Sequence, residues 1–388
     1  MTRSESLDNL ISLPEALAKI DGAVTRLGPS RVTAAQAVGC VLEEDVTATV
    51  NVPGFPRSAM DGVALRVADL EGPGPWSLPI QSVIEAGDTL QKSLNHKHAV
   101  KIMTGAPLAE GADVVIPIED VTIAAGRVTV AEKPKAGAFI RPLGNDITSG
   151  QVLYRRGDTL RPGDIGILAS IGLTEINVIP RPRIALVSTG SEVVEPGVDL
   201  KHGQIYDSNI PTLHSLLTYD RYPVATQTRV TTNELEPLRD KLRECLKNHD
   251  LVITTGAVSM GDFDFIPDVV ETLGGKTLFY KLAVKPGKPT LMADFGNSWL
   301  LSLPGNPVSA LIGYHLYVRR ILSLMMGLRY EPRSSQAKLG DDVTVTGKRF
   351  NIIGARLETT PGGLVAYPAQ RQESGRLSST LGINGLLM

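Results

Sequence analysis

RIALVSTGSE, residues 183–192, is the stretch that most directly indicates the fold of this chain. It begins as an apolar run rich in Ile, Leu and Val, typical of a buried strand, and it then reaches a Thr-Gly pair where the backbone can turn. Two later apolar runs, 251–254 and 299–303, also lead into loops that contain glycine. The three stretches therefore predict three buried strands, each followed by a glycine-containing loop.

Helical patterns separate and follow these strands. Apolar residues recur at helical spacing along four segments, which are 210–217, 234–246, 266–273 and 308–326. The first of them is expected to be capped by Asp207, Ser208 or Asn209. Strands that alternate with helices predict a parallel sheet covered on both faces, so residues 181–327 are interpreted as an α/β domain.

The rest of the chain is predicted to be mostly β structure. An amphipathic helix is expected over 12–27, because Ser12 and Glu15 have the spacing of a capping box and apolar residues follow at helical intervals. Short strand-like runs then alternate with Gly/Pro turns as far as about residue 180, with one helix at 163–171. The last segment, 335–388, returns to strands.

The predicted fold class is a multidomain α/β plus β protein, with β-rich N-terminal modules and a small C-terminal β domain. Four domains are expected: residues 1–50 with 141–180 as an N-terminal helix and an elongated, β-rich linking module, residues 51–140 as a β-rich module, residues 181–327 as the α/β domain, and residues 328–388 as the C-terminal β domain.

Composition excludes several classes of protein. The 388 residues carry a formal net charge of −2, which argues against a broad nucleic-acid-binding surface. No apolar run approaches the roughly 18 residues of a membrane-spanning helix, and the N-terminus lacks the apolar core of a signal peptide. Cys40 and Cys245 are far apart in sequence, and the histidines form no His-x-x-x-His pair, which argues against a zinc hydrolase. We therefore expect a soluble, cytoplasmic protein with structural thiols.

The glycine loops are the first candidate ligand site. Ligands bind α/β sheets at the carboxyl ends of the strands, where all three predicted loops lie. Glycine lets backbone N–H groups approach a ligand closely, which suits an anion such as phosphate. None of the loops matches a Walker loop or a Gly-x-Gly-x-x-Gly fingerprint, so ATPase and dinucleotide interpretations lack their usual signature. The alternative for each loop is an ordinary turn.

The segment 281–289 is the second candidate. It places Lys281, Lys285 and Lys288 within nine residues, and two prolines and a glycine fix the intervening backbone. This favours lysines aimed at an anion over the alternative, a solvated strand edge.

Five short motifs occur in a specific order: SAMDG at 58–62, MTGAP at 103–107, STGSE at 188–192, KPGKP at 285–289 and LPGNPVS at 303–309. This order resembles the molybdopterin molybdenumtransferases, a family related to the E domain of gephyrin. The resemblance covers most of residues 10–380. Each motif alone is modest, but all five in this order are highly specific.

The resemblance implies an enzyme of molybdenum cofactor biosynthesis. Such an enzyme inserts molybdate into adenylylated molybdopterin, releases AMP and is assisted by Mg²⁺, and the α/β segment is its molybdopterin-binding domain. The resemblance also implies a homodimer that works alongside other proteins of molybdenum cofactor biosynthesis. The dithiolene sulfurs belong to the substrate, so the protein needs no cysteine ligands for molybdenum.

Carried over by motif, the resemblance assigns roles to particular residues. The implied catalytic set is Asp61, Thr104, Asp146, Glu192, Asp250, Asp264, Lys281 and Lys285. The implied molybdopterin-binding set is Gly190, Ser191, Gly256, Ser259, Lys288, Pro304, Gly305 and Pro307. Asp61, Glu192 and Asp264 are the carboxylates expected to hold Mg²⁺.

The chain departs from the family pattern at several positions. The family usually has Asn where Arg57 stands, Gly where Ala257 stands, and Gly-Ser-Gly where residues 373–375 read Glu-Ser-Gly. Relatives commonly continue for further strands after Leu386, so the last domain, 328–388, is expected to be incomplete. Two alternatives stay open: a non-catalytic molybdopterin-binding or scaffold protein of the same fold, and an adenylyltransferase that makes the activated pterin. The long β-rich region argues against the second, and the sequence does not separate molybdenum from tungsten.

Overall fold

The computed structural model describes residues 10–89, 91–231, 234–257, 265–345, 347–369 and 373–388. The chain divides into two compact units. Unit 1 comprises residues 1–30, 39–41 and 179–388, and unit 2 comprises residues 31–38 and 42–178. The multidomain α/β plus β architecture predicted from the sequence is confirmed.

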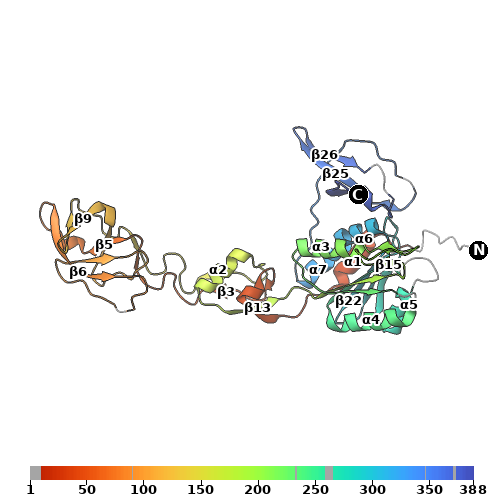
Figure 1. Ribbon diagram of the computed structural model, residues 1–388, viewed down its shortest axis with the longest axis horizontal. Coiled ribbons are helices and arrows are strands. Elements are labelled where there is room, and N and C mark those ends of the chain that lie inside the picture. The colour runs from red at the N-terminus through yellow and green to blue at the C-terminus, as the bar shows by residue number, and fades with distance from the viewer. Residues whose placement is uncertain (1–9, 90, 232–233, 258–264, 346, 370–372) are drawn as a thin grey trace, which may run out of the picture. The chain divides into compact units, whose positions relative to one another are not determined.

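A six-stranded sheet forms the centre of unit 1 (Figure 1). Its strand order is β17-β14-β18-β22-β21-β19, with bounds Val224–Val230, Ile184–Thr189, Leu251–Thr255, Trp299–Leu303, Leu291–Asp294 and Lys276–Tyr280. The first four strands are parallel, as predicted. β21 is the exception, because it runs against both β22 and β19, while β19 runs in the direction of the first four strands. The predicted parallel sheet is therefore wrong at β21.

Helices cover both faces of this sheet, as predicted (Figure 1). One face packs against α1 (Leu13–Ala23), α3 (Asn209–Tyr219) and the helical stretch α6-η5-α7, and the other packs against α4 (Leu235–Asn248) and α5 (Ile266–Thr272). Side chains alternate along each strand, so Leu186 faces the first set of helices and Val187 the second. The long predicted helix over 308–326 consists of α6 (Pro307–Gly313), a π-helical turn (Tyr314–Val318) and α7 (Arg319–Met325).

The N-terminal helix packs in unit 1. The Ser12 hydroxyl caps α1 by accepting a hydrogen bond from the Glu15 N–H at 3.3 Å, as the capping-box spacing predicts. Leu13, Ala16 and Ile20 are buried in the core beside the α/β sheet. The predicted grouping of this helix with residues 141–180 differs from the observed division, because its apolar face is satisfied by the α/β core.

The C-terminal part of unit 1 is a small four-stranded sheet with order β23-β26-β25-β27. Their bounds are Lys338–Leu339, Gly363–Pro368, Ile353–Thr360 and Gly385–Leu387. The predicted strands are present, and β25 and β26 pair antiparallel as a hairpin around Pro361-Gly362. Two further short strands, β20 (Val284–Lys285) and β24 (Phe350–Asn351), pair with each other. This pairing brings the lysine segment beside the segment that leads into the C-terminal sheet.

Unit 2 is mostly β structure, as predicted. Its main sheet has the order β8-β5-β7-β6-β10-β9, with bounds Val114–Pro117, Gly62–Leu65, Ala99–Ile102, Trp76–Ile84, Arg127–Val130 and Val121–Ala124. The β9–β10 hairpin turns through Ala125 and Gly126, both at positive φ, as a two-residue turn of this kind requires. The one predicted helix is α2 (Pro162–Ser170), which ends before Gly172 at φ +76°.

Candidate active site

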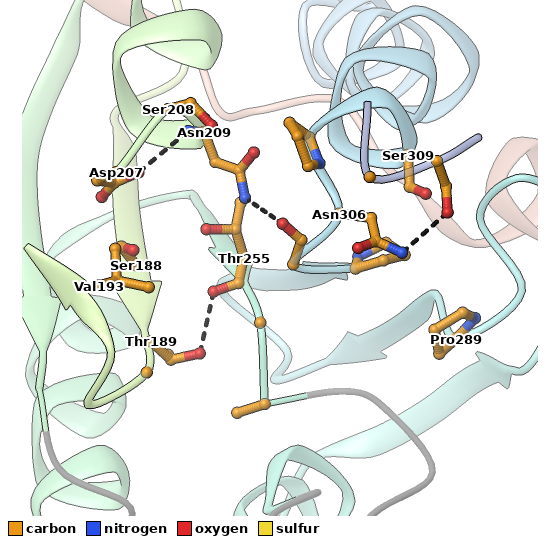
Figure 2. A pocket seen from close by; sticks show the side chains of 18 of the residues that line it. Ser188, Thr189, Val193, Asp207, Ser208, Asn209, Thr255, Pro289, Asn306 and Ser309 are labelled. Carbon is orange, nitrogen blue, oxygen red and sulfur yellow. Dashed lines mark hydrogen bonds between the residues drawn. The ribbon is translucent and has the colours of Figure 1, made fainter. Parts of the chain in front are cut away.

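A cavity of about 1330 Å³ lies at the carboxyl ends of β14, β18 and β22 (Figure 2). Its lining includes the three loops predicted from the sequence, and all of its lining residues belong to unit 1. The start of α3, residues 285–289 of the lysine segment, residues 373–375 and Leu377 also line the cavity. The cavity therefore occupies the part of an α/β sheet where ligands bind.

The glycine loops meet backbone to backbone. Gly256 has φ +89°, and its N–H donates to the carbonyl of Leu303 at 3.1 Å. A Cβ at Gly256 would lie 2.7 Å from the carbonyl oxygen of Thr189, whereas a Cβ at Gly305 would make an ordinary contact of 3.6 Å with Gly256 Cα. Glycine is therefore required at 256 both by the backbone conformation and by the neighbouring strand.

The start of α3 forms one wall of the cavity. The buried carboxylate of Asp207 accepts hydrogen bonds from the N–H groups of Asn209 and Ile210, both at 3.0 Å. Ser208 occupies the N-cap position but makes no side-chain cap, so the capping side chain among the three is that of Asp207, one residue earlier. Its second oxygen accepts from Arg229 Nε at 3.2 Å. The Asn209 amide Nδ2 donates to the carbonyl of Gly305 at 2.8 Å. This wall therefore ties α3 to the loop after β22.

Cationic side chains form another part of the lining. Lys285 and Lys288 line the cavity together with Arg349, whose guanidinium donates to the Val284 carbonyl at 3.3 Å. The same lining also contains the carboxylates of Glu192, Asp207 and Glu373, so the cavity is mixed in charge, and Lys285, Lys288 and Arg349 are the part of it that can attract an anionic ligand.

The C-terminal segment closes the cavity on a further side, which the sequence analysis did not assign to the site. Asn306 Nδ2 donates to the Ser374 hydroxyl at 2.9 Å, and the Val308 N–H donates to the Ser374 carbonyl at 3.3 Å. Glu373 and Gly375 also line the cavity. Ser374 lies in the Glu-Ser-Gly stretch that stands where the family has Gly-Ser-Gly, but no role was assigned to it, and no local pattern indicates Arg349. The folding of the chain brings both residues to loops far away in sequence.

The predicted site residues fall into five groups, the last of which is Asp250 alone. Those that line the cavity are Gly190, Glu192, Gly256, Lys285, Lys288, Pro304, Gly305 and Pro307. Ser191 and Lys281 are in unit 1 but are not in the described lining, and Lys281 Nζ lies over the Tyr280 ring at 5.0 Å from its centroid. Asp61, Thr104 and Asp146 are in unit 2. Ser259 and Asp264 lie outside the described residues.

Asp250 is positioned at the other end of the sheet. It comes directly before β18, whereas the cavity lies after that strand. Its carboxylate accepts hydrogen bonds from the Arg183 N–H at 2.7 Å and from Arg183 Nη2 at 2.8 Å. Asp250 therefore fixes the backbone at Arg183, directly before β14, and it does not line this cavity.

Asp61 and Thr104 form a tight pair in unit 2. Asp61 Oδ1 accepts hydrogen bonds from the Thr104 N–H at 2.6 Å and from the Thr104 hydroxyl at 2.9 Å. The backbone N–H is the main cause that lowers the pKa of Asp61, followed by the Thr104 hydroxyl. The sequence analysis named both residues, 43 positions apart, and the structure brings them together.

Two absences bear on the kind of site. Among the residues that the structure describes, no group of three or more His, Cys, Asp or Glu side chains could hold a metal ion. Within the same residues, no helix is long and apolar enough to cross a membrane.

Comparison with known proteins identifies the family. The family model for the MoeA N-terminal region (domain I and II) matches residues 11–172, and that for the probable molybdopterin binding domain matches residues 185–323. Molybdopterin molybdenumtransferases are among the similar proteins. That of Staphylococcus epidermidis is 30% identical over 97% of this chain and 91% of its own length, and that of Haemophilus influenzae is 38% identical over 75% of this chain and 72% of its own.

A solved structure agrees in sequence and fold. One solved structure of the molybdopterin biosynthesis MoeA protein of Pyrococcus horikoshii is 28% identical to this chain and superposes with a TM-score of 0.76. The match covers 97% of this chain and 94% of the chain in that structure. The similarity thus extends through both units and not only through the α/β sheet. The order of the five motifs, the glycine-lined cavity and these relatives agree, and the chain belongs to the molybdopterin molybdenumtransferase family.

Proposed function

We propose that this transferase of molybdenum cofactor biosynthesis inserts molybdate into the dithiolene of adenylylated molybdopterin and releases AMP. The observation that carries the proposal is the cavity itself. Its glycine loops offer close backbone approach, and Lys285, Lys288 and Arg349 give it the positive charge that an anionic pterin phosphate and molybdate require.

The lysines and the loops have separate roles in this proposal. Lys285 and Lys288 attract molybdate and the phosphate end of molybdopterin, while the loops at Gly190, Gly256 and Gly305 let the pterin approach the backbone closely. The two cysteines take no part. Cys40 and Cys245 are buried, and burial raises the pKa of each thiol, which disfavours the thiolate that a metal would need.

Mg²⁺ fits this site as an assisting ion. Glu192 lines the cavity with an exposed side chain, and Mg²⁺ is commonly held by one or two carboxylates together with substrate phosphates. When bound, the ion would supply positive charge to the phosphate oxygens. Among the carboxylates that line the cavity, we assign Glu192 to the Mg²⁺ ion. Asp264 and Asp61 remain predicted ligands of the ion.

The proposed assembly is a homodimer in the cytoplasm, working with other proteins of molybdenum cofactor biosynthesis. Light scattering on the purified protein tests the dimer and should give twice the 41.5 kDa of the chain. A mass of one chain would contradict it.

The reaction is tested directly by combining purified protein with adenylylated molybdopterin, molybdate and Mg²⁺. AMP release and formation of the molybdenum cofactor should increase together and depend on all three additions. Binding of molybdopterin without either product would instead indicate a scaffold protein of the same fold.

A further inference from the structure

Two buried polar atoms in the cavity lack a hydrogen-bond partner among the described residues. They are the hydroxyl Oγ1 of Thr255 and the amide oxygen Oδ1 of Asn209, and both residues line the cavity. Thr255 is only 1% exposed, so bulk water does not satisfy its hydroxyl. An unpartnered buried polar atom is costly, and where it lines a cavity it indicates a group that a ligand completes.

The direction of the Asn209 amide is fixed by its other contact. Its Nδ2 donates to the Gly305 carbonyl, and its backbone N–H donates to Asp207. Oδ1 is therefore the amide atom of Asn209 that has no described hydrogen-bond partner, and as a carbonyl oxygen it can only accept a hydrogen bond. A carbonyl oxygen does not attract an anion, so this wall is unsuited to phosphate or molybdate.

Side chains alternate between the two faces of the sheet along β18, which explains why the Thr255 hydroxyl is available to a ligand and the Thr254 hydroxyl is not. Thr254 and Thr255 point to opposite faces of the sheet, and both are buried. The hydroxyl of Thr254 shares a hydrogen bond with Ser302, whereas the hydroxyl of Thr255 has no such partner in the described structure. The Thr255 carbonyl is used separately, since it accepts from the Thr189 hydroxyl at 3.0 Å.

The cavity is thus polarised. Thr255 and Asn209 lie on one side of it in Figure 2, with Pro289 of the lysine loop on the other. A ligand that fits both sides carries N–H donors at one end and negative charge at the other. Molybdopterin has this form, because the pyrimidine edge of its pterin ring carries N–H groups beside a carbonyl, while its phosphate lies at the far end of the molecule.

We infer that Asn209 Oδ1 and the Thr255 hydroxyl bind the N–H edge of the pterin ring, and so orient molybdopterin with its anionic end toward Lys285 and Lys288. Asn209 Oδ1 accepts from a ring N–H or amine, and the Thr255 hydroxyl donates to or accepts from the same edge. The inference rests on the proposed function, since it specifies how that site recognises its substrate.

The test compares two neighbouring threonines of the same strand. Thr255→Val removes the hydroxyl at nearly constant shape, and it should weaken binding of metal-free molybdopterin about three- to tenfold in anaerobic titrations. Its melting temperature should not fall, because no described internal hydrogen bond is lost. Thr255→Ser should retain the affinity.

Thr254→Val is the matched control. It leaves Ser302 without its partner, so its melting temperature should fall while its affinity for molybdopterin is unchanged. AMP and molybdate, titrated separately, should bind all these variants as they bind the wild type.

Three results would overturn the inference: unchanged molybdopterin affinity in Thr255→Val, a loss of stability in Thr255→Val like that of Thr254→Val, or a loss of affinity for AMP in place of molybdopterin. If the wild type itself does not bind molybdopterin, the proposed function fails. If the wild type binds and Thr255→Val binds equally well, only the inference about Thr255 and Asn209 fails.

Discussion

Ala257 adopts a backbone conformation that favours glycine. Its φ is +48°, in the left-handed region, and it lines the cavity directly after Gly256. Because a side chain in that region costs about 1–2 kcal/mol, we expect Ala257→Gly to stabilise the protein by about 1 kcal/mol in urea unfolding. Ala293→Gly, in the buried strand β21, is the control and should destabilise. Equal destabilisation by both changes would show that the left-handed backbone carries no penalty at 257.

Lys285 tests the role of charge in the cavity. If it attracts molybdate, Lys285→Ala should raise the molybdate concentration needed for half-maximal rate by about tenfold, and the difference should shrink at high salt. Lys276→Ala, exposed at the start of β19, is the control and should behave as the wild type. Identical molybdate dependence in both variants would indicate that Lys285 does not attract molybdate and that the lysine segment is an ordinary solvated strand edge.

The Asp61–Thr104 pair predicts a pH effect. The pKa of Asp61 is lowered mainly by the Thr104 N–H, so any stability from this pair is present above the ordinary aspartate pKa and is lost as the pH falls through the lowered value. Thr104→Val removes only the hydroxyl, the smaller cause, and should raise the pKa part of the way to normal. An NMR titration of the Asp61 carboxyl measures this. A pKa that does not move would mean that the hydroxyl does not bind the carboxylate.

At the scale of elements, the loops after β18 and β22 differ in what they tolerate. Gly256→Ala should destabilise the protein by about 1–3 kcal/mol, because its Cβ meets the Thr189 carbonyl and its φ is positive. Gly305→Ala should be close to neutral in stability, because its Cβ finds an ordinary contact. Thermal unfolding of both variants checks the contrast. A stable Gly256→Ala protein would mean that Gly256 and the Thr189 carbonyl can move apart without cost.

The sequence predicted the elements whose pattern is local and strong. The buried strands β14, β18 and β22 are nearly continuous apolar runs, and the helices between them carry a clear apolar stripe. The strands it missed have weaker patterns. β17 alternates half-buried and exposed residues at one edge of the sheet, and β21 is a run of only four residues that ends in Asp294. An edge strand such as β17 buries less surface, so its sequence is less restricted, whereas β21 lies inside the sheet and is buried but is too short to show a period.

The same distinction applies to the site. Residues in loops that directly follow a predicted strand could be placed from the sequence, and the structure finds Gly190, Gly256 and Gly305 in one cavity. Arg349 and Ser374 could not, because the pairing of β20 with β24 and the contact of Asn306 with Ser374 bring them there. Tertiary contacts of this kind leave no period or spacing in the sequence.

At the scale of the whole molecule, the N-terminal segment is built into the unit that holds the cavity. The Ile11 N–H donates to the Lys281 carbonyl, and the Ala283 N–H donates to the Ile11 carbonyl, so this segment holds the start of the lysine loop. Ile20 is fully buried in the adjoining core. A change in α1 should therefore affect unit 1 and not unit 2.

The two tryptophans allow this to be measured, since Trp299 is in unit 1 and Trp76 is in unit 2. In a Trp76→Phe background, Ile20→Ala should lower the unfolding free energy reported by Trp299 by about 2–5 kcal/mol, because it leaves a cavity in a packed core. In a Trp299→Phe background, the same change should leave the transition reported by Trp76 in place. Ala18→Ser, on the exposed side of α1, should move neither. If both transitions shift together, the two units unfold as one cooperative structure, and α1 stabilises the whole chain and not only the unit that holds the cavity.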